Sequence, residues 1–291
     1  MNKLIIAFLL SFSLTVHSHS ISCIPENDLY ISHQHKGLSD VTEATFNKAI
    51  ADFQEIYEDI IKENFNANLN IKGDWEDGTV NAYARRLGRT WEVQMFGGLA
   101  RHQEATLDGF KAVLCHEIGH HMGGAPKYSG LFNRWASSEG QSDYFATAKC
   151  LPKLFKQQEE KTLKIYNKEN LTDEEKFAKE KCDKTYTNEF EAAKCFRSGL
   201  AGQALARLLG SLRGNPDVKF SEPDSSVVDS TQHGHPAAQC RLDTYFQGAL
   251  CVNDFSVLPD NRDASIGYCT GVDQFLTGLR PHCWYNPKDY E

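Results

Sequence analysis

Residues 116–120 read His-Glu-Ile-Gly-His, a pattern that works only if the chain is helical at this point. Positions four apart on a helix lie on one face, one turn apart, so His116 and His120 can reach the same ion. Neutral imidazole nitrogens bind zinc at about 2.0–2.1 Å, and the carboxylate of Glu117 beside them is suited to act as a general base. These five residues therefore predict a helix that carries half of a zinc site.

A catalytic zinc ion takes three protein ligands and keeps one position for water, so the two histidines require a third ligand. Glu139 and Asp143 follow one turn apart on a second predicted helix, across a turn long enough to fold back. Glu139 is the better candidate for the ligand, and Asp143 would then accept the other ring N–H of a ligand histidine. On spacing alone the two carboxylates could exchange these roles.

Glu117 is not a ligand in this arrangement. Zinc lowers the pKa of a bound water to about 7, and Glu117 would take the proton of that water during attack and return it to the leaving amine. His121 faces about 100° away from His120 on the same helix and is not expected to bind the ion. A site of this kind predicts a peptide or protein substrate.

The first 22 residues have the pattern of a signal peptide, with Lys3 before an apolar run over 4–14 and small residues near the expected cleavage point. The apolar run is short for crossing a bilayer, and a buried N-terminal helix is the alternative. No second long apolar stretch follows, so we expect no transmembrane segment in the mature chain 23–291. The predicted location is the periplasm or the outside of the cell.

Nine cysteines support export, because exported chains oxidise most of theirs. Cys23 stands at the predicted cleavage point, where a lipid anchor is possible, although Ser20, Ile21 and Ser22 make a poor lipidation motif. The remaining cysteines are even in number, which predicts disulfide bonds. Eight cysteines allow 105 connectivities, and the sequence does not choose among them. Cys115 directly precedes the first motif histidine, and we interpret it as structural.

The composition is that of a globular protein, with 41% hydrophobic and 24% charged residues, and the net charge of −8 argues against nucleic acid as a partner. Helical periodicity predicts helices over 39–65, with Ser39 or Asp40 as the cap, and over 187–213. Capping residues predict one from Thr106 to Gly123 and one from Ser138, in capping-box spacing with Gln141, to about Cys150. Strands are expected within 66–105, including one over 90–96. Residues 153–184 form a charged helical insertion, and the tail from 215 is loop-rich. The predicted fold is α+β, one domain in which a small, mostly antiparallel sheet packs against the motif helix.

A second motif lies far downstream, where His235 and Pro236 are followed by Arg241 in the pattern His-Pro-x4-Arg. Together with the HExGH helix and the Glu-x3-Asp helix, it resembles the M48 zinc metallopeptidases, soluble exported gluzincins related to the Ste24/HtpX type. The resemblance covers about 90–150 and 228–242. It implies a zincin-like fold, one zinc ion per chain and Glu139 as the third ligand. It also implies that His235 either steadies the oxyanion or shields the zinc, and that Arg241 hydrogen-bonds the active-site residues or the substrate. His233 could compete for the role of His235.

The sequence thus predicts a zinc-dependent endopeptidase that acts in the cell envelope or outside the cell. The alternative is a zinc-containing envelope chaperone or binding protein with little or no proteolytic activity. A closed structural zinc site is disfavoured, because such sites normally use cysteine ligands. Zincins bind an extended substrate along the edge of a sheet, and the strand around Trp91 to Phe96 is the candidate edge. An ordinary core strand is the alternative for this segment.

Overall fold

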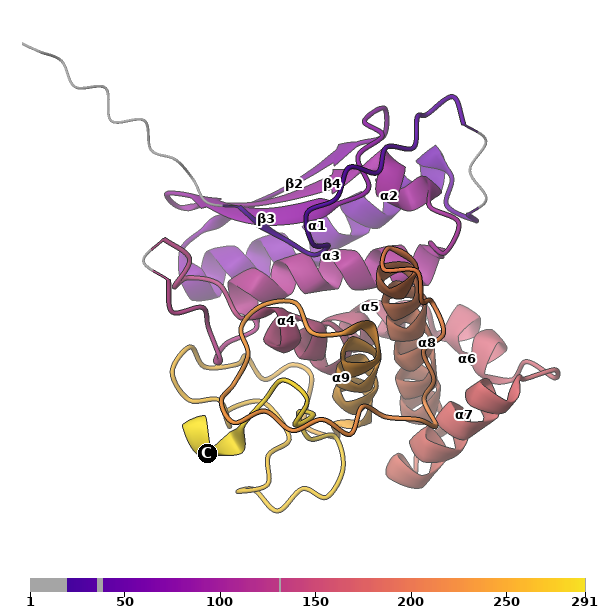
Figure 1. Ribbon diagram of the computed structural model, residues 1–291, viewed down its shortest axis with the longest axis vertical. Helices are drawn as coiled ribbons and strands as arrows, with labels where there is room; N and C mark the ends of the chain where they lie inside the picture. The colour runs from indigo at the N-terminus through magenta and orange to yellow at the C-terminus, as the bar shows by residue number, and fades with distance from the viewer. Residues whose placement is uncertain (1–19, 36–38, 131, 291) are drawn as a thin grey trace, which may run out of the picture.

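The computed structural model describes residues 20–35, 39–130 and 132–290, and most of the predicted signal peptide lies outside this range. The fold is α+β, with one mixed sheet at one end and helices filling the rest (Figure 1). Helices α1, α2 (Gly97–Arg101) and α3 pack against the sheet, the later helices lie on the far side of α3, and the C-terminal loops close the opposite end (Figure 1). This layering places α3, which carries the HExxH motif, across the middle of the molecule.

The sheet has four strands in the order β1-β3-β4-β2 within the described chain. Their bounds are β1 (Ile21–Ser22), β2 (Asn68–Asp74), β3 (Ala82–Leu87) and β4 (Thr90–Phe96). The strand expected over 90–96 is confirmed as β4. The pairings of β1 with β3 and of β3 with β4 are antiparallel, whereas β2 runs parallel to β4, so the sheet is mixed.

The prediction that the strand over 91–96 is an edge strand is wrong, and the alternative of a core strand is confirmed. β4 lies between β3 and β2 and is buried over Trp91–Met95, including Glu92 at 1% exposure. A continuous run of buried residues is typical of a central strand, and Trp91 in this run packs in the hydrophobic core. The strand next to the site is β3, and the short β1 pairs with its outer side.

Helix α1 (Glu43–Phe65) begins later than its periodicity suggested, because Thr42 and not Ser39 or Asp40 is its N-cap. Thr42 and Thr45 form a reciprocal capping box there. Asp40 instead caps the motif helix, since its carboxylate accepts the backbone N–H of Leu107 at 2.9 Å. The connection before α1 therefore fixes the start of α3.

Helix α3 (Leu107–Met122) is capped by Thr106, as predicted, with Gly123 at its other end. All residues from Gly109 to Met122 are buried, not only one apolar face. A helix buried on every side lies in the core of its domain. Gly119 lies against the backbone of Ser142 on α4, where an added Cβ would stand 3.0 Å from that Cα, so the absence of a side chain allows close approach.

The helix that starts after Ser138 differs from the expectation in two ways. Ser138 forms no capping hydrogen bond, and Gln141 donates to the carbonyl of Gly123 at 2.7 Å instead of closing a capping box. The helix also does not end before Pro152. α4 (Glu139–Phe145) runs through a π-helical turn (Ala146–Cys150) into α5 (Leu151–Lys156), because proline is tolerated in the first turn of a helix.

The charged segment 153–184 is helical over most of its length, and its helices α6 and α7 pack against α8. The helices after α5 are α6 (Glu159–Tyr166), α7 (Asp173–Thr185), α8 (Glu189–Ser211) and α9 (Ala238–Leu250). α9 lies within the tail expected to be loop-rich, so that expectation is wrong over this stretch. Its buried face, with Leu242, Tyr245 and Phe246, packs on α8 in the core. A short 3-10 turn (Pro287–Asp289) follows near the C-terminus.

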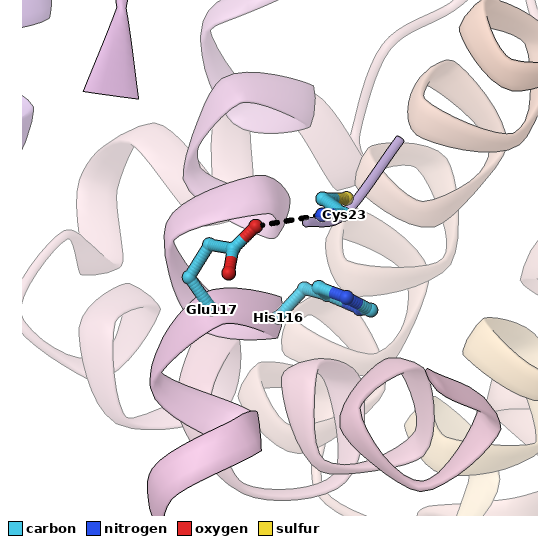
Figure 2. A group of neighbouring side chains, drawn as sticks. All are labelled: Cys23, His116 and Glu117. Carbon is cyan, nitrogen blue, oxygen red and sulfur yellow. Dashed lines mark hydrogen bonds between the residues drawn. The ribbon is translucent and has the colours of Figure 1, made fainter. Parts of the chain in front are cut away.

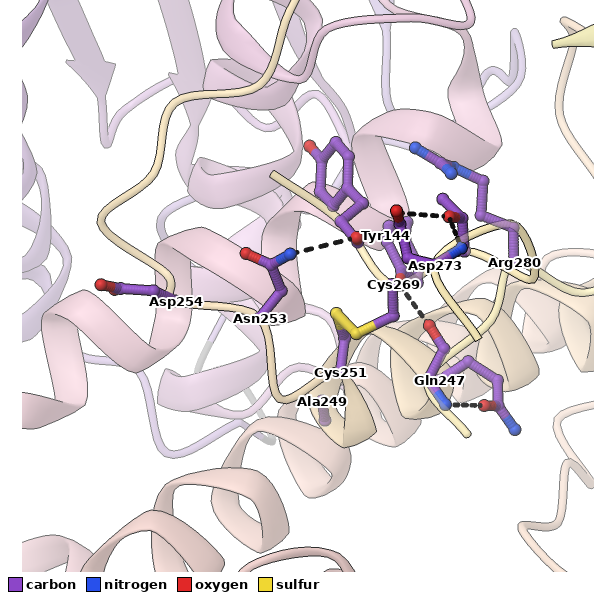
Figure 3. Close-up of a disulfide and its surroundings, with 12 residues drawn as sticks. Tyr144, Gln247, Ala249, Cys251, Asn253, Asp254, Cys269, Asp273 and Arg280 are labelled. Atoms are coloured by element: carbon purple, nitrogen blue, oxygen red, sulfur yellow. Dashed lines mark hydrogen bonds between the residues drawn. A yellow bond between two sulfur atoms is a disulfide. The ribbon is translucent and has the colours of Figure 1, made fainter. Parts of the chain in front are cut away.

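Four disulfide bonds are present, which fits an exported protein. They join Cys115 to Cys150, Cys182 to Cys195, Cys240 to Cys283, and Cys251 to Cys269. Figure 3 shows the last of these, where the C-terminal loop is tied to the end of α9. Hydrogen bonds secure the same junction: Asn253 donates to the carbonyl of Tyr268 at 3.2 Å, and the Gln247 side chain accepts from Gly278 at 2.9 Å. Among the described residues, no helix combines the length and apolar character that crossing a membrane would require.

Candidate metal centre

Three of the predicted ligands meet at one point inside the protein. His116 Nε2 lies 3.2 Å from Glu139 Oε2, and His120 Nε2 lies 3.6 Å from Glu139 Oε1. The two histidines come from α3 and Glu139 from the first turn of α4, and all three side chains are fully buried. One ligand atom from each residue lies within 4.8 Å of the others, a grouping that could hold a metal ion.

The chemistry of these three atoms fits a bound cation. His116 Nε2, His120 Nε2 and Glu139 Oε2 are buried and form no hydrogen bond. Buried polar atoms without a partner are costly and uncommon, and three facing one another imply a ligand that satisfies them together. Two imidazole nitrogens and one carboxylate oxygen are the donor set of many catalytic zinc sites.

The other ring nitrogens hold the histidines in place. His116 Nδ1 donates to Asp143 Oδ1 at 2.7 Å, and His120 Nδ1 donates to the backbone carbonyl of Ser137 at 2.9 Å. These contacts place the ring proton on Nδ1 in both residues and leave Nε2 free to bind a metal. Burial lowers the pKa of His120 to about 4, so this ring is neutral at pH 7, as a ligand must be.

Asp143 is itself held from α9. Arg241 donates two hydrogen bonds to its carboxylate, from Nε at 2.7 Å and from Nη2 at 2.6 Å, and Tyr245 donates a third. Burial alone would raise the pKa of Asp143, but the Arg241 guanidinium holds it below its usual value. Asp143 is therefore ionised beneath His116, where its charge makes the imidazole a stronger donor.

Glu117 lies beside the donor group without belonging to it. Its carboxylate is fully buried, Oε2 forms no hydrogen bond, and Oε1 accepts the backbone N–H of Cys23 at 3.0 Å (Figure 2). Burial raises the pKa of Glu117 to about 8. A carboxyl with a pKa near neutrality exchanges protons readily at physiological pH, which suits a general base.

Two other groups of ligand atoms occur in the described chain. One combines Cys23, His116 and Glu117 and would leave His120 and Glu139 unsatisfied. The other is formed by Asp224 with Cys240 and Cys283, whose sulfurs are joined to each other and offer no thiolate. Of the three groups, that of His116, His120 and Glu139 is therefore the best candidate for holding a cation.

His235 reaches the same site from the turn before α9, and Pro236 follows it directly. Its Nε2 lies 3.3 Å from Glu139 Oε2 and 2.8 Å from the backbone carbonyl of Ser22. His233 does not share this position. Its backbone carbonyl accepts the N–H of Glu139 at 3.1 Å, and its ring lies 6.3 Å from the ring of Tyr128.

His121 points away from the donor group, as its helical position predicts. Its ring stacks between Trp91 and Trp135, with ring centroids 5.0 and 4.9 Å away. Its Nε2 lies 3.3 Å from the carbonyl of Glu92. The third histidine of the motif helix therefore packs the helix against the sheet.

Three contacts to the site were absent from the sequence interpretation. Tyr128 donates to Glu139 Oε1 at 2.9 Å, Tyr245 donates to Asp143, and Cys23 contacts Glu117 through its backbone. Tyr245 stands four residues after Arg241, so recognition of α9 would have placed both on one face. Nothing in the local sequence marks Tyr128 or Cys23 as part of the site.

A scan against protein-family models gave no match for this chain, and searches of curated proteins and of solved structures gave none either.

Proposed function

We propose that this protein is a zinc-dependent endopeptidase with a zincin-like site of the M48 type. The observation that carries the proposal is the meeting of three buried atoms without a hydrogen bond, from His116, His120 and Glu139, with the unpaired Oε2 of Glu117 beside them. Zinc bound there would polarise the substrate carbonyl and lower the pKa of a bound water. Four disulfide bonds agree with action outside the cytoplasm.

Each neighbouring residue has a role in this chemistry. Glu117 accepts a proton from the attacking water and returns it to the leaving nitrogen of the cleaved peptide bond. His235, whose Nε2 already contacts a backbone carbonyl, donates a hydrogen bond to the carbonyl oxygen under attack. Burial lowers the pKa of His235, so the ring is neutral and donates without adding charge next to the metal.

Arg241 acts through Asp143 on the ligand His116. It fixes the Asp143 carboxylate by two hydrogen bonds, and Asp143 fixes the orientation of His116. Arg241 also donates to the carbonyl of Cys23 at 2.9 Å, so one of its amino groups is available to a peptide in the site. We therefore assign Arg241 to positioning both the ligand and the substrate backbone.

Zinc content and a paired substitution test the proposal. Purified protein should bind about one zinc ion per chain, measured by atomic absorption after removal of loose metal. Glu117→Gln should keep that zinc and lose hydrolysis of a mixed peptide library by about 100- to 10,000-fold, because only the proton acceptor is removed. Glu58→Gln, at an exposed position on α1, is the matched control and should leave both measurements unchanged.

The same experiment separates the alternatives. A binding protein that holds zinc without proteolysis would show one ion per chain and no hydrolysis in wild type. Zinc well below one ion per chain would contradict the metal site itself. Hydrolysis retained by Glu117→Gln would contradict the assigned mechanism while leaving the site in place.

A further inference from the structure

The chain's own N-terminal segment lies across the candidate site. Strand β1 pairs antiparallel with β3, with Ile21 opposite Ala84 and Ser22 opposite Tyr83, and the backbone N–H of Cys23 lies 3.3 Å from the carbonyl of Ala82. Addition of an extended segment to the free side of a strand is a common way for a protein to bind a peptide. The segment therefore occupies the place along β3 that a peptide substrate would take.

The peptide bond between Ser22 and Cys23 is held on both sides by residues assigned to the chemistry. The carbonyl oxygen of Ser22 lies 2.8 Å from His235 Nε2. The amide N–H of Cys23 donates to Glu117 Oε1 at 3.0 Å, a contact drawn in Figure 2. A scissile bond needs this arrangement, with a donor at the oxygen and a proton carrier at the nitrogen.

Residues after this bond are anchored more deeply than those before it. Cys23 and Ile24 are fully buried, and Arg241 holds the carbonyl of Cys23 at 2.9 Å. The Cys23 sulfur groups with His116 and Glu117, and the donor group of His116, His120 and Glu139 forms without it. The hydrogen bonds to His235 and Glu117, by contrast, are made by backbone atoms of the segment and hold its peptide bond at the site.

We propose that the chain cleaves itself between Ser22 and Cys23. The proposal rests on the function proposed above, because it uses the same site. One water is consumed: its oxygen bonds to the carbonyl carbon of Ser22, and the C–N bond to Cys23 breaks. Glu117 moves a proton from the water to the nitrogen of Cys23. The products are a carboxylate at Ser22 and an amine at Cys23, and departure of β1 leaves the side of β3 free for other peptides.

The predicted signal peptide ends at the same bond, so the experiment must exclude a separate signal peptidase. The full chain is made by cell-free translation without membranes, in a glutathione buffer that allows disulfide bonds, and is then given zinc or a chelator. Intact-mass measurement should show zinc-dependent loss of residues 1–22. The first-order rate should not change over a tenfold range of protein concentration, because the bond is presented within one chain. Glu117→Gln should slow the cleavage about 100- to 10,000-fold.

Two substitutions at one position separate the backbone from the thiol. Cys23→Ala should still be cleaved, because the sulfur takes no part in the step. Cys23→Pro removes the N–H that Glu117 accepts and should abolish cleavage. Loss of cleavage in Cys23→Ala would overturn the backbone assignment.

Thiol labelling tests whether the N-terminal segment around Cys23 occupies the site, and it requires neither zinc nor catalytic activity. Cys23 is the one cysteine outside a disulfide bond in the described chain, and it is buried. In metal-free uncleaved Glu117→Gln, alkylation of Cys23 should be at least about tenfold slower than in the urea-unfolded chain. Labelling at the unfolded rate would show that the segment does not occupy the site and would overturn the proposal.

The outcomes distinguish failure of this proposal from failure of the proposed function. Hydrolysis of library peptides by a chain that keeps residues 1–22 under the cell-free conditions would overturn self-cleavage and leave the peptidase standing. A cleavage rate proportional to protein concentration would show that one chain cuts another and would overturn the intramolecular step. A zinc-loaded chain that cleaves neither itself nor any library peptide would remove both proposals.

Discussion

Helix α3 carries two buried polar clusters that differ in how completely they are paired. Near its first turn, Asp108 accepts two hydrogen bonds from Arg197 at 2.7 and 2.9 Å and one from Lys111 at 3.0 Å. Two turns further on, His116 and His120 face Glu139 through atoms that form no hydrogen bond. Burial alone therefore does not mark a functional site, whereas several unpaired ligand atoms that face one another indicate one.

The pKa values of the carboxyl groups in the two clusters are also shifted in opposite directions. Burial opposes the ionisation of Asp108, but the charges and hydrogen bonds of Arg197 and Lys111 lower its pKa to about 2. Burial raises the pKa of Glu117 to about 8, because removing the carboxyl from water disfavours its charged form. The first carboxylate stabilises the fold as a fixed charge, and the second is left free to exchange a proton.

The largest expected effect on stability comes from breaking the paired cluster. Asp108→Asn leaves Arg197 buried without its counter-charge and should lower the free energy of unfolding by about 3–5 kcal/mol, measured by urea denaturation of the metal-free protein. Asp52→Asn, which breaks the exposed pair with Lys48, is the control and should leave the free energy of unfolding nearly unchanged.

The same pair predicts a pH dependence. The pKa of Asp108 is lower in the folded chain than the usual value of about 4. Its contribution to stability is therefore complete above about pH 4 and is lost as the pH falls to about 2. The difference in the free energy of unfolding between wild type and Asp108→Asn, measured by urea denaturation, should therefore shrink as the pH falls over this range. A difference that stays constant would contradict the pairing of Asp108 with Arg197.

A smaller change in stability should follow when zinc binds the unpaired cluster of His116, His120 and Glu139. Zinc at 100 times its dissociation constant should raise the free energy of unfolding by about 2.7 kcal/mol, read as a shift of the urea midpoint. Glu139→Gln should lose this increment while its metal-free stability stays equal or rises, because a buried charge has been removed. A fall of several kcal/mol in the metal-free form would show that Glu139 serves the fold, as Asp108 does.

The smallest effect is expected at the third histidine of the motif helix. His121→Phe keeps the stacking between Trp91 and Trp135, so it should change stability by about 1 kcal/mol or less and keep the zinc. His120→Phe, the same change one residue earlier, should lose most of the bound zinc. Metal analysis of both variants compares the two faces of α3, and loss of zinc from His121→Phe would contradict the division between them.

Much of the arrangement at the site follows from helical spacing. The positions of His116 and His120 on one face, and of Glu139 and Asp143 one turn apart, are fixed by local periodicity. The order of the sheet is not local in this way. The aromatic residues of β4 favour a strand, but only pairing with distant β2 and β3 makes it central.

Other parts of the site could not be predicted because their contacts span the chain. Ser22 meets His235 across a separation of 213 residues, and nothing near either residue signals the contact. Helix α9 was not predicted, because Pro236 just before it favours a turn and the surrounding tail was expected to be loop-rich. The helical spacing of Leu242, Tyr245 and Phe246 does indicate a helix. The capping box predicted at Ser138 does not form, because the Gln141 side chain donates instead to the carbonyl of Gly123, the residue that follows α3.

The disulfide between Cys115 and Cys150 has a consequence for recovery from denaturation. Cys115 precedes His116, and Cys150 ends the π-helical turn that follows α4, so the bond closes a loop that contains both halves of the donor group. For a sequence separation of 35, the lost conformational entropy raises the free energy of the unfolded chain by about 4 kcal/mol. An oxidised chain therefore keeps His116 and Glu139 at a high local concentration even when unfolded, whereas a reduced chain must find the same encounter by diffusion.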